Sequence, residues 1–189
     1  MAWYPAKAPL PTGLTTEQLL LRPLRPSDAD QDFAAMQDRW DTKDWEDLTW
    51  AGNYAALIHH EQEHLSREAF TFTVMDPTNR TCLGCVYLEP LVNLLPTSHR
   101  TQVTALEIPL TAVAVRYWIR DRYLQSGLSA HLLATLLPWF HKAWQLPSRI
   151  FHTRPDDRHQ NELYPTLGFQ PVLDLPITYG RLYRPPQGQ

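Results

Sequence analysis

The stretch from residue 111 to residue 144 constrains the fold most, because it joins three patterns in a fixed order. An apolar, β-branched run at 111–119 predicts a strand, and an amphipathic run that follows predicts a helix at 127–144. A short loop that ends in Gly127 lies between them. The first N–H groups of a helix have no partner inside the helix, and the helix dipole adds partial positive charge there. The stretch therefore predicts a strand–loop–helix unit whose helix start can hold a phosphate or pyrophosphate group.

Length, charge and cysteine usage limit the remaining possibilities. A chain of 189 residues suits one domain with a sizeable core; we expect an irregular, proline-rich N-terminal arm at 1–16 and a single domain at 17–189.

The net charge of -3 and the pI near 6.2 show no basic bias, so no nucleic-acid partner is expected. No apolar run approaches the ~20 residues that span a bilayer, and the N-terminus lacks the pattern of a signal peptide. The two cysteines form no disulfide framework. We therefore expect a cytoplasmic protein, a monomer or homodimer, with no membrane partner.

The other segments alternate between helical and strand patterns. Tyr54, Leu57, Ile58 and Leu65 mark the expected buried side of a helix at 54–67. The segment from Trp40 to Gly52 fits neither pattern and is interpreted as a tryptophan-rich loop, and residues 92–110 as a less patterned connection. Further helices are predicted at 27–36 and 155–167, and further strands at 18–24, 69–75, 82–88, 149–153, 169–175 and 177–183. Because hairpins alternate with helices, we expect an α+β fold in α/β/α layers: a mixed, largely antiparallel central sheet of about six or seven strands flanked by helices.

Two sequence blocks carry a resemblance to a known family. Residues 119–129 follow the pattern V-x-P-x-[YF]-[RQ]-x-x-G-x-[GA] at Ile119, Tyr123, Gly127 and Ser129, with Asp121 and Leu124 as departures. The second block, P-x-N followed by L-Y-x-x-L-G-F, is matched by Pro155, Asp157 (for the Asn), Leu163, Tyr164, Leu167, Gly168 and Phe169. With both blocks in this order, residues 18–175 resemble the GNAT superfamily of N-acetyltransferases. The opening LLLRPLRPSDAD and the pair Tyr117-Trp118 are most similar to the RimJ/RimL-like branch, in which a bulky apolar residue is common where Leu124 lies.

This resemblance implies a GNAT-like fold and an acetyl-CoA-dependent N-acetyltransferase. The acetyl group would pass directly from the thioester to an amine, either a protein N-terminus or a small amine, and no metal is expected. At Gly127 the missing Cβ allows a ligand to approach the backbone closely. Tyr164 falls at the position of the family's tyrosine acid, and a phenol with a pKa of ~10 can donate a proton to the leaving thiolate. The residues implied for cofactor binding are Trp118, Ile119, Leu124, Gln125, Ser126, Gly127, Leu128, Ser129, Ala130 and Asp157.

The general base is not defined by the sequence. Many family members carry a glutamate at the position of Ala114, and Glu89, Glu107 and His152 are candidate substitutes here. An α-amino group with a pKa of ~8 is already partly neutral near pH 7, whereas a lysine ε-amine with a pKa of ~10.4 is not. The missing glutamate therefore favours a less basic acceptor or a water relay.

Three arginines near the loop carry separate hypotheses. Strand alternation puts Arg116 on one face with Ala112, Ala114 and Trp118, where Arg116 could bind a substrate carboxylate. Arg120 and Arg122 could meet the distal phosphate of the cofactor, although solvated surface positions are favoured for both.

Two alternative functions stay open. Residues 60–64 fit H-E-x-x-H, in which His60 and His64 share a helix face with Glu61 between them, as in zinc hydrolases. The pattern needs a third ligand, and only unpatterned candidates such as Glu68, Glu89 and His99 follow, so an ordinary amphipathic helix is favoured. The other alternative is a GNAT-like domain that binds an acyl-CoA without efficient catalysis. The missing glutamate, Leu124 and the helix-disrupting Pro165 favour it.

Cys82 and Cys85 form a C-x-x-C pair. Residues three apart on a strand point to opposite faces unless a bulge intervenes, and no second pair completes a four-cysteine zinc site. Buried strand cysteines are therefore predicted.

Overall fold

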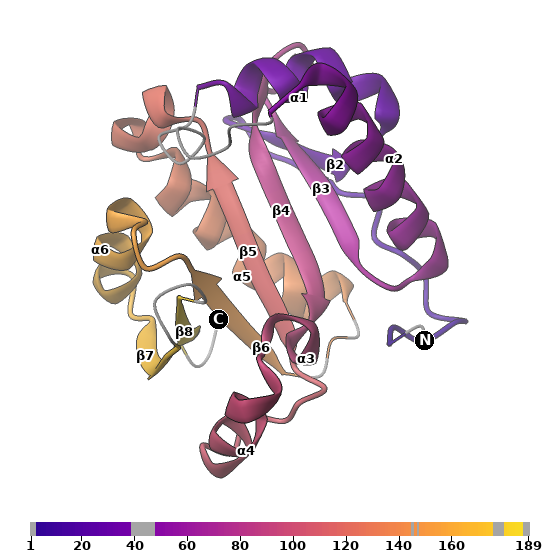
Figure 1. The fold of residues 1–189 in the computed structure, drawn as a ribbon. Helices are drawn as coiled ribbons and strands as arrows, with labels where there is room; N and C mark the ends of the chain where they lie inside the picture. The colour runs from indigo at the N-terminus through magenta and orange to yellow at the C-terminus, as the bar shows by residue number, and fades with distance from the viewer. Residues whose placement is uncertain (1–2, 39–47, 145, 147, 176–179, 187–189) are drawn as a thin grey trace.

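A single central sheet organises the chain, and helices cover both of its faces (Figure 1). The computed structural model describes residues 3–38, 48–144, 146, 148–175 and 180–186. The strands are β1 (Leu14–Thr15), β2 (Leu20–Pro23), β3 (Phe70–Met75), β4 (Cys82–Pro90), β5 (Val113–Ile119), β6 (Arg149–Thr153), β7 (Gln170–Asp174) and β8 (Arg181–Arg184). They form one eight-stranded sheet in the order β1-β2-β3-β4-β5-β6-β8-β7. The β5–β6 pair is parallel and the other neighbouring pairs are antiparallel. The predicted mixed, largely antiparallel sheet is confirmed, with eight strands where six or seven were expected.

The described helices are the 3-10 helix η1 (Pro26–Asp28), α1 (Ala29–Met36), α2 (Trp50–Ser66), α3 (Leu91–Leu94), α4 (Thr97–Ala105), the 3-10 helix η3 (Asp121–Ser126), α5 (Leu128–Ala143) and α6 (Arg158–Thr166). Among the described residues the helices follow the predicted order, and α3, α4 and η3 are additions to it. The connection at 92–110 therefore contains helical structure, with Pro90 and Pro96 as the residues before α3 and α4. Most of the predicted tryptophan-rich loop, residues 39–47, lies outside the described residues. No described helix is long and apolar enough to cross a bilayer.

Each face of the sheet has its own helices. Helix α5 packs on one face, behind the sheet in Figure 1, with Leu132, Leu136 and Phe140 in the core. On the other face, α1 and α2 cover one end through Met36 and Leu57. Helices α3 and α4 cover the opposite end of that face, where Leu91, Val103, Ala112, Ala114 and Ile150 cluster. The part of this second face between the two helix pairs carries the middle of β5.

Strands β5 and β6 pair over three residues and then diverge, as Figure 1 shows. The pairs are Val113 with Arg149, Ala114 with Ile150 and Val115 with Phe151. Beyond them, the side-chain amide of Gln160 on α6 donates to the carbonyl oxygen of Tyr117 at 2.8 Å. A side chain thus takes the hydrogen bond that a continued strand pair would make.

The buried side of α2 differs from the expected one. Asn53, Leu57 and His64 are buried, whereas Tyr54 and Leu65 are 38% and 74% exposed. The predicted buried side was assigned from the apolar side chains alone. The helix also buries two polar side chains, Asn53 and His64. Asn53 donates to the Asp32 carboxylate at 3.0 Å, and the His64 ring packs edge-on against Phe70. The helix also begins earlier than predicted, because the Thr49 hydroxyl accepts from the Gly52 N–H and caps it.

A bulge between β3 and β4 sets the direction of the two cysteines. Met75 pairs with Cys82 and Val74 with Gly84, so Leu83 is an extra residue on β4. Cys82 and Cys85 are both buried, as predicted, and both join the cluster under α1 and α2. The bulge is the stated exception to the divergence of residues three apart on a strand, and it turns both thiols to the same face.

The first residues of the arm pack on the core through Tyr4. This side chain is 2% exposed, and its ring lies edge-on to Phe70 and Trp144, each at 5.4 Å between centroids. Replacing Tyr4 by Ala removes these contacts and leaves a cavity, so we expect the free energy of unfolding to fall by about 3 kcal/mol. Urea denaturation measures this change.

Lys7→Ala is the matched control, because Lys7 is exposed in the same segment. It should change the free energy of unfolding by less than about 0.5 kcal/mol. If Tyr4→Ala is as neutral as Lys7→Ala, the arm does not pack on the core in solution.

Candidate active site

Two adjoining clefts lie where β5 leaves β6. The larger has a volume of about 300 Å³ and is lined by residues that include Met36, His60, Tyr87, Arg116 and His152. The smaller lies toward the loop before α5 and includes Ile119, Leu124 and Ser129. The two clefts share four lining residues: Tyr117, Trp118, Asp157 and Gln160. The diverging strands therefore separate two openings that meet at the end of β5.

The start of α5 faces the smaller cleft, and its N-cap residue provides no capping side chain. Gly127 is its N-cap residue and has no side chain that could accept from the first N–H groups, although the Leu128 N–H donates to the Ser126 hydroxyl at 3.3 Å. Its φ of 81° lies in the left-handed region, which favours glycine, and an added Cβ would meet no atom within 4 Å. Gln125, Ser126 and Gly127 are exposed, while Ser129 is buried. The helix start is thus open to a ligand, and its anion-binding role stays a prediction.

Asp38 ties the loop to the end of α1. The Asp121 N–H donates to the Asp38 carbonyl oxygen at 3.1 Å, a bond that the family's proline at this position could not make. The carboxylate of Asp38 pairs with the guanidinium groups of both Arg120 and Arg122. Burial alone would raise the pKa of Asp38, but the two arginines outweigh it and hold the pKa below its ordinary value. Both arginines hold the loop in place through their ion pairs with Asp38. The solvated position expected for both fits Arg122, which is exposed, and does not fit Arg120, which is buried.

Within the described part of the chain, the buried Tyr164 hydroxyl has no hydrogen-bond partner, and those of Tyr117 and Ser129 have none but each other. Tyr117 lies between the other two, because its ring is 6.3 Å from that of Tyr164 and the Ser129 hydroxyl influences its pKa. An unpartnered buried hydroxyl costs about 1–3 kcal/mol. Such a group is expected where a ligand supplies the missing partner, so these residues fit a site for a polar ligand.

Tyr164 lies beneath the clefts and lines neither of them. Its ring stacks on Phe169 at 4.8 Å and meets Tyr183 edge-on at 4.9 Å. Burial, with smaller contributions from Tyr117 and Asp157, raises the pKa of Tyr164 well above its ordinary value. Pro165 lies in the last turn of α6, so the helix contains Tyr164 despite the proline. The side chain is protonated at neutral pH, and its proton-donating role stays a prediction.

Tyr117 is a candidate that sequence reasoning missed. It lines both clefts, and its hydroxyl has no partner among the described residues other than Ser129. Burial raises the pKa of Tyr117, the charge of Asp157 adds to the effect, and the hydrogen bond with Ser129 opposes it. The sequence showed Tyr117 only as half of the pair Tyr117-Trp118. Tyr117 lines the two clefts because the pairing of β5 with β6 ends before it. The local sequence around Tyr117 does not show where that pairing ends.

The open part of the second sheet face carries a compact polar group on β4 and β5. Tyr87 lies opposite Arg116, and Glu89 lies opposite Ala114 in the strand register. Opposite residues of an antiparallel pair share a face, so the carboxylate absent at Ala114 is present on the neighbouring strand. Arg116 pairs with Glu89 and lies over the Tyr87 ring at 5.4 Å.

The remaining predicted residues take different positions. Trp118 is buried and donates to the Tyr87 hydroxyl at 3.1 Å, at the wall between the clefts. Asp157 caps α6 by accepting from the Gln160 N–H at 2.9 Å. His152 lines the larger cleft, whereas Glu107 is exposed beyond α4 and lines neither cleft.

The H-E-x-x-H residues do not gather as a metal centre. His60 pairs with Glu63 at 3.0 Å, and buried His64 packs against Phe70 and Phe72. Burial lowers the pKa of His64, although a hydrogen bond to the backbone of Thr71 opposes this. Among the described residues, the metal-ligating side chains that do converge are Asp32, Cys82 and Cys85. The geometry does not favour the zinc-hydrolase alternative.

The diverging parallel strands and the open helix start fit the GNAT-like fold that the sequence resemblance implied. The family comparison agrees: the Acetyltransferase (GNAT) domain matches residues 18–170. The chain belongs to this family, as the sequence resemblance implied. A comparison with curated proteins gives no match.

Solved structures share the fold at low sequence identity. A proposed ribosomal-protein-serine acetyltransferase from Vibrio cholerae superposes with a TM-score of 0.69 at 16% identity, over 90% of this chain and 95% of that one. The ribosomal-protein-S5-alanine acetyltransferase from Vibrio fischeri gives 0.64 at 19%, over 92% and 94%. RimL, a ribosomal L7/L12 alpha-N-protein acetyltransferase in complex with coenzyme A, gives 0.64 at 12%, over 90% and 93%. These identities support a common fold and leave the acceptor open.

Proposed function

We propose that this protein is an acetyl-CoA-dependent N-acetyltransferase that transfers the acetyl group directly to an amine, either a protein N-terminus or a small amine. The observation that carries the proposal is the divergence of β5 from β6 beside the open, glycine-led start of α5, with a cleft on each side. Membership of the GNAT family and the coenzyme A complex of RimL support it. In this proposal residues 17–189 form the acyl-CoA-binding domain and residues 1–16 its arm.

The cofactor side would be the smaller cleft. Main-chain N–H groups between Gln125 and Ala130 would hold the pyrophosphate at the helix start. The backbone groups of Tyr117 and Ile119 face away from β4, since Val113 on the same alternation bonds Ser148 and the Tyr117 carbonyl accepts from Gln160. Because the Tyr117 carbonyl is engaged, the N–H groups of Tyr117 and Ile119 would align an extended ligand arm and polarise a thioester carbonyl in this proposal. Bound acetyl-CoA would supply the activated acetyl group.

The acceptor side would be the larger cleft, with Glu89 as the group that handles the amine proton. Glu89 lies opposite the family's glutamate position, and its partner Arg116 lines the cleft. Glu89 lies on β4, one strand away from the family's glutamate position on β5. It would therefore take the amine proton through a water molecule more readily than directly. This arrangement suits an α-amino group, which is partly neutral near pH 7. The ribosomal-protein acetyltransferases among the similar structures point the same way.

A GNAT-like domain that binds an acyl-CoA without efficient turnover is the second candidate. The absence of a carboxylate at Ala114 favours it, because the Glu89 carboxylate is engaged by Arg116. The proposed enzyme and this binding domain share the cofactor and differ in the release of free thiol.

The function is tested with acetyl-CoA and a panel of acceptors. Saturating acetyl-CoA should stabilise the protein by about 2.7 kcal/mol at one hundred times its Kd, measured as a thermal shift. Free thiol should then be released with peptides that carry a free N-terminus, and not with the same peptides acetylated in advance. A shift without thiol release supports the binding domain, and the absence of any shift contradicts both candidates.

Tyr164→Phe should lower kcat by about 100-fold while the KM for acetyl-CoA stays unchanged, because loss of a positioned acid costs about 10²–10⁴-fold. Stability should not fall, since the Tyr164 hydroxyl has no partner in the described residues. Steady-state kinetics and urea denaturation give the two measurements.

Tyr183→Phe is the control from the same aromatic cluster, because the Tyr183 hydroxyl donates to Asn161 at 2.9 Å. It should cost about 1 kcal/mol of stability and leave kcat unchanged. Full activity in Tyr164→Phe would exclude Tyr164 as the acid, and Tyr117→Phe then tests the second phenol.

Glu89→Gln and Arg116→Ala both break the same ion pair. Comparing them separates proton handling by Glu89 from binding of a substrate carboxylate by Arg116. If Glu89 handles the amine proton, Glu89→Gln should lower kcat at pH 7 by about 100-fold, with recovery at higher pH where the amine is already neutral. Arg116→Ala should instead raise the acceptor KM for carboxylate-bearing acceptors. The pH dependence of kcat and kcat/KM distinguishes these outcomes.

Equal kinetic losses in the two variants would mean that the ion pair is structural. An unchanged acceptor KM in Arg116→Ala would remove Arg116 from acceptor binding.

A further inference from the structure

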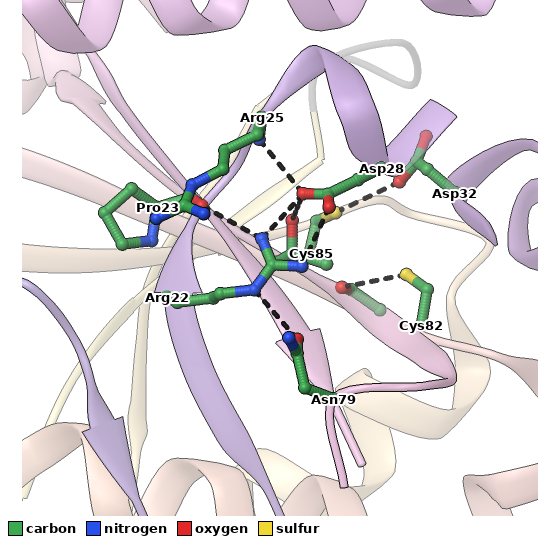
Figure 2. Close-up of polar contacts among 10 residues, drawn as sticks. Arg22, Pro23, Arg25, Asp28, Asp32, Asn79, Cys82 and Cys85 are labelled. Carbon is green, nitrogen blue, oxygen red and sulfur yellow. Dashed lines mark hydrogen bonds and ion pairs between the residues drawn. The ribbon is translucent and has the colours of Figure 1, made fainter. Parts of the chain in front are cut away.

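Two thiols and a carboxylate converge under α1, outside both clefts. One Asp32 oxygen and the Sγ atoms of Cys82 and Cys85 all lie within 4.8 Å of one another. The three residues are 3%, 1% and 0% exposed, respectively. The Cys85 thiol donates to the Asp32 Oδ1 atom at 3.5 Å, and the Cys82 thiol donates to the Gly84 carbonyl oxygen at 3.6 Å (Figure 2). Figure 2 shows Asp32 above the two cysteines, on the helix that covers β4.

The local backbone is built for this convergence. The bulge at Leu83 puts both thiols on the α1 side of the sheet, where an unbroken strand would separate them. Gly84 has no room for a side chain, because a Cβ there would lie 1.9 Å from the Trp118 carbonyl oxygen. A glycine between the cysteines therefore lets β4 lie close to β5 while the bulge turns the thiols together.

We propose that Cys82, Cys85 and Asp32 form a binding site for a thiophilic divalent cation of the zinc class. Tetrahedral zinc has Zn–S distances of about 2.3 Å and Zn–O distances of about 2.1 Å, so its ligand atoms lie about 3.5–3.8 Å apart. The Cys85–Asp32 distance of 3.5 Å already matches this spacing, and the other pairs lie within 4.8 Å. On binding, each thiol releases its proton to solvent and becomes a thiolate ligand. Three protein ligands leave the fourth position to a water molecule.

The surrounding hydrogen bonds suit a ligand set more than a hydrophobic core. Asn53 donates to the second Asp32 oxygen at 3.0 Å, which leaves Oδ1 directed at the sulfur atoms. Such an outer partner orients a metal-binding carboxylate. Arg22 pairs with neighbouring Asp28 through two bonds of 2.7 and 2.8 Å and adds positive potential near both thiols. Arg22 forms its ion pair with Asp28, and the contacts given for Asp32 are the Asn53 amide and the Cys85 thiol.

A cation here would join α1 to the sheet. Asp32 comes from α1 and both cysteines come from β4, next to Met36 and Trp118 in the same cluster. These two side chains also line the larger cleft. The proposed site therefore lies directly behind the cleft wall and does not depend on the acetyltransferase proposal.

The test is a titration of the reduced, metal-free, full-length protein with Co²⁺. One equivalent should produce a sulfur-to-cobalt charge-transfer band. Cys82→Ser and Cys85→Ser should each lower the affinity by about 100-fold or more, since loss of even an outer partner costs about 10–100-fold. The matched control is His60→Ala, which should bind like the wild type because His60 belongs to the H-E-x-x-H pattern and not to this site.

Native mass spectrometry of the wild type with Cd²⁺ keeps the proposal testable if the serine variants fail to fold. A single adduct should appear with at least two protons lost, and the thermal unfolding temperature should rise. A protein that shows neither the charge-transfer band nor the single adduct overturns the proposal. Binding that both serine variants retain and His60→Ala loses also overturns it, by moving the site to the histidines.

Discussion

The hydrogen bond from Gln160 to the Tyr117 carbonyl is the interaction on which the site depends. After three residue pairs the parallel strands β5 and β6 part, and a buried carbonyl left without a donor would be costly. Gln160 supplies the donor from α6, and Asp157 fixes Gln160 by capping that helix. Gln160 therefore satisfies the Tyr117 carbonyl without pairing β5 to β6 at this point. The two clefts lie at this end of β5.

A second constraint holds the loop that faces this opening. In place of the family's proline, the chain uses Asp121, whose N–H bonds Asp38. Arg120 and Arg122 converge on the same carboxylate, and Arg120 does so from a buried position. A buried charge left unpaired is strongly destabilising, so α1 and the loop are held to one another. The rigidity that proline would supply through its fixed φ comes here from a tertiary ion-pair network, which preorganises the start of α5 for a ligand.

The sequence predicts best where a local pattern repeats and worst where partners meet across elements. The unit at 111–144 was predictable because apolar periodicity and Gly127 lie within one stretch. The face of α2 was not, since Asn53 is buried only because Asp32 accepts its hydrogen bond. The position of Glu89 opposite Ala114 depends on strand register, and the convergence of the cysteines depends on a bulge. Neither leaves a trace in composition or spacing.

The buried polar groups discussed above differ between the two faces of the sheet in whether they have hydrogen-bond partners. On the α1 and α2 side the acids are satisfied, with Arg22 on Asp28 and Asn53 on Asp32, so this network fixes how the helices sit. On the α5 and α6 side the Tyr164 hydroxyl lacks a partner in the described residues, and those of Tyr117 and Ser129 have only each other. Phenylalanine and alanine would fill that space at a lower desolvation cost. In the proposed function a bound ligand would supply the missing partner, and Tyr117 and Ser129 line the smaller cleft where the cofactor is proposed to bind.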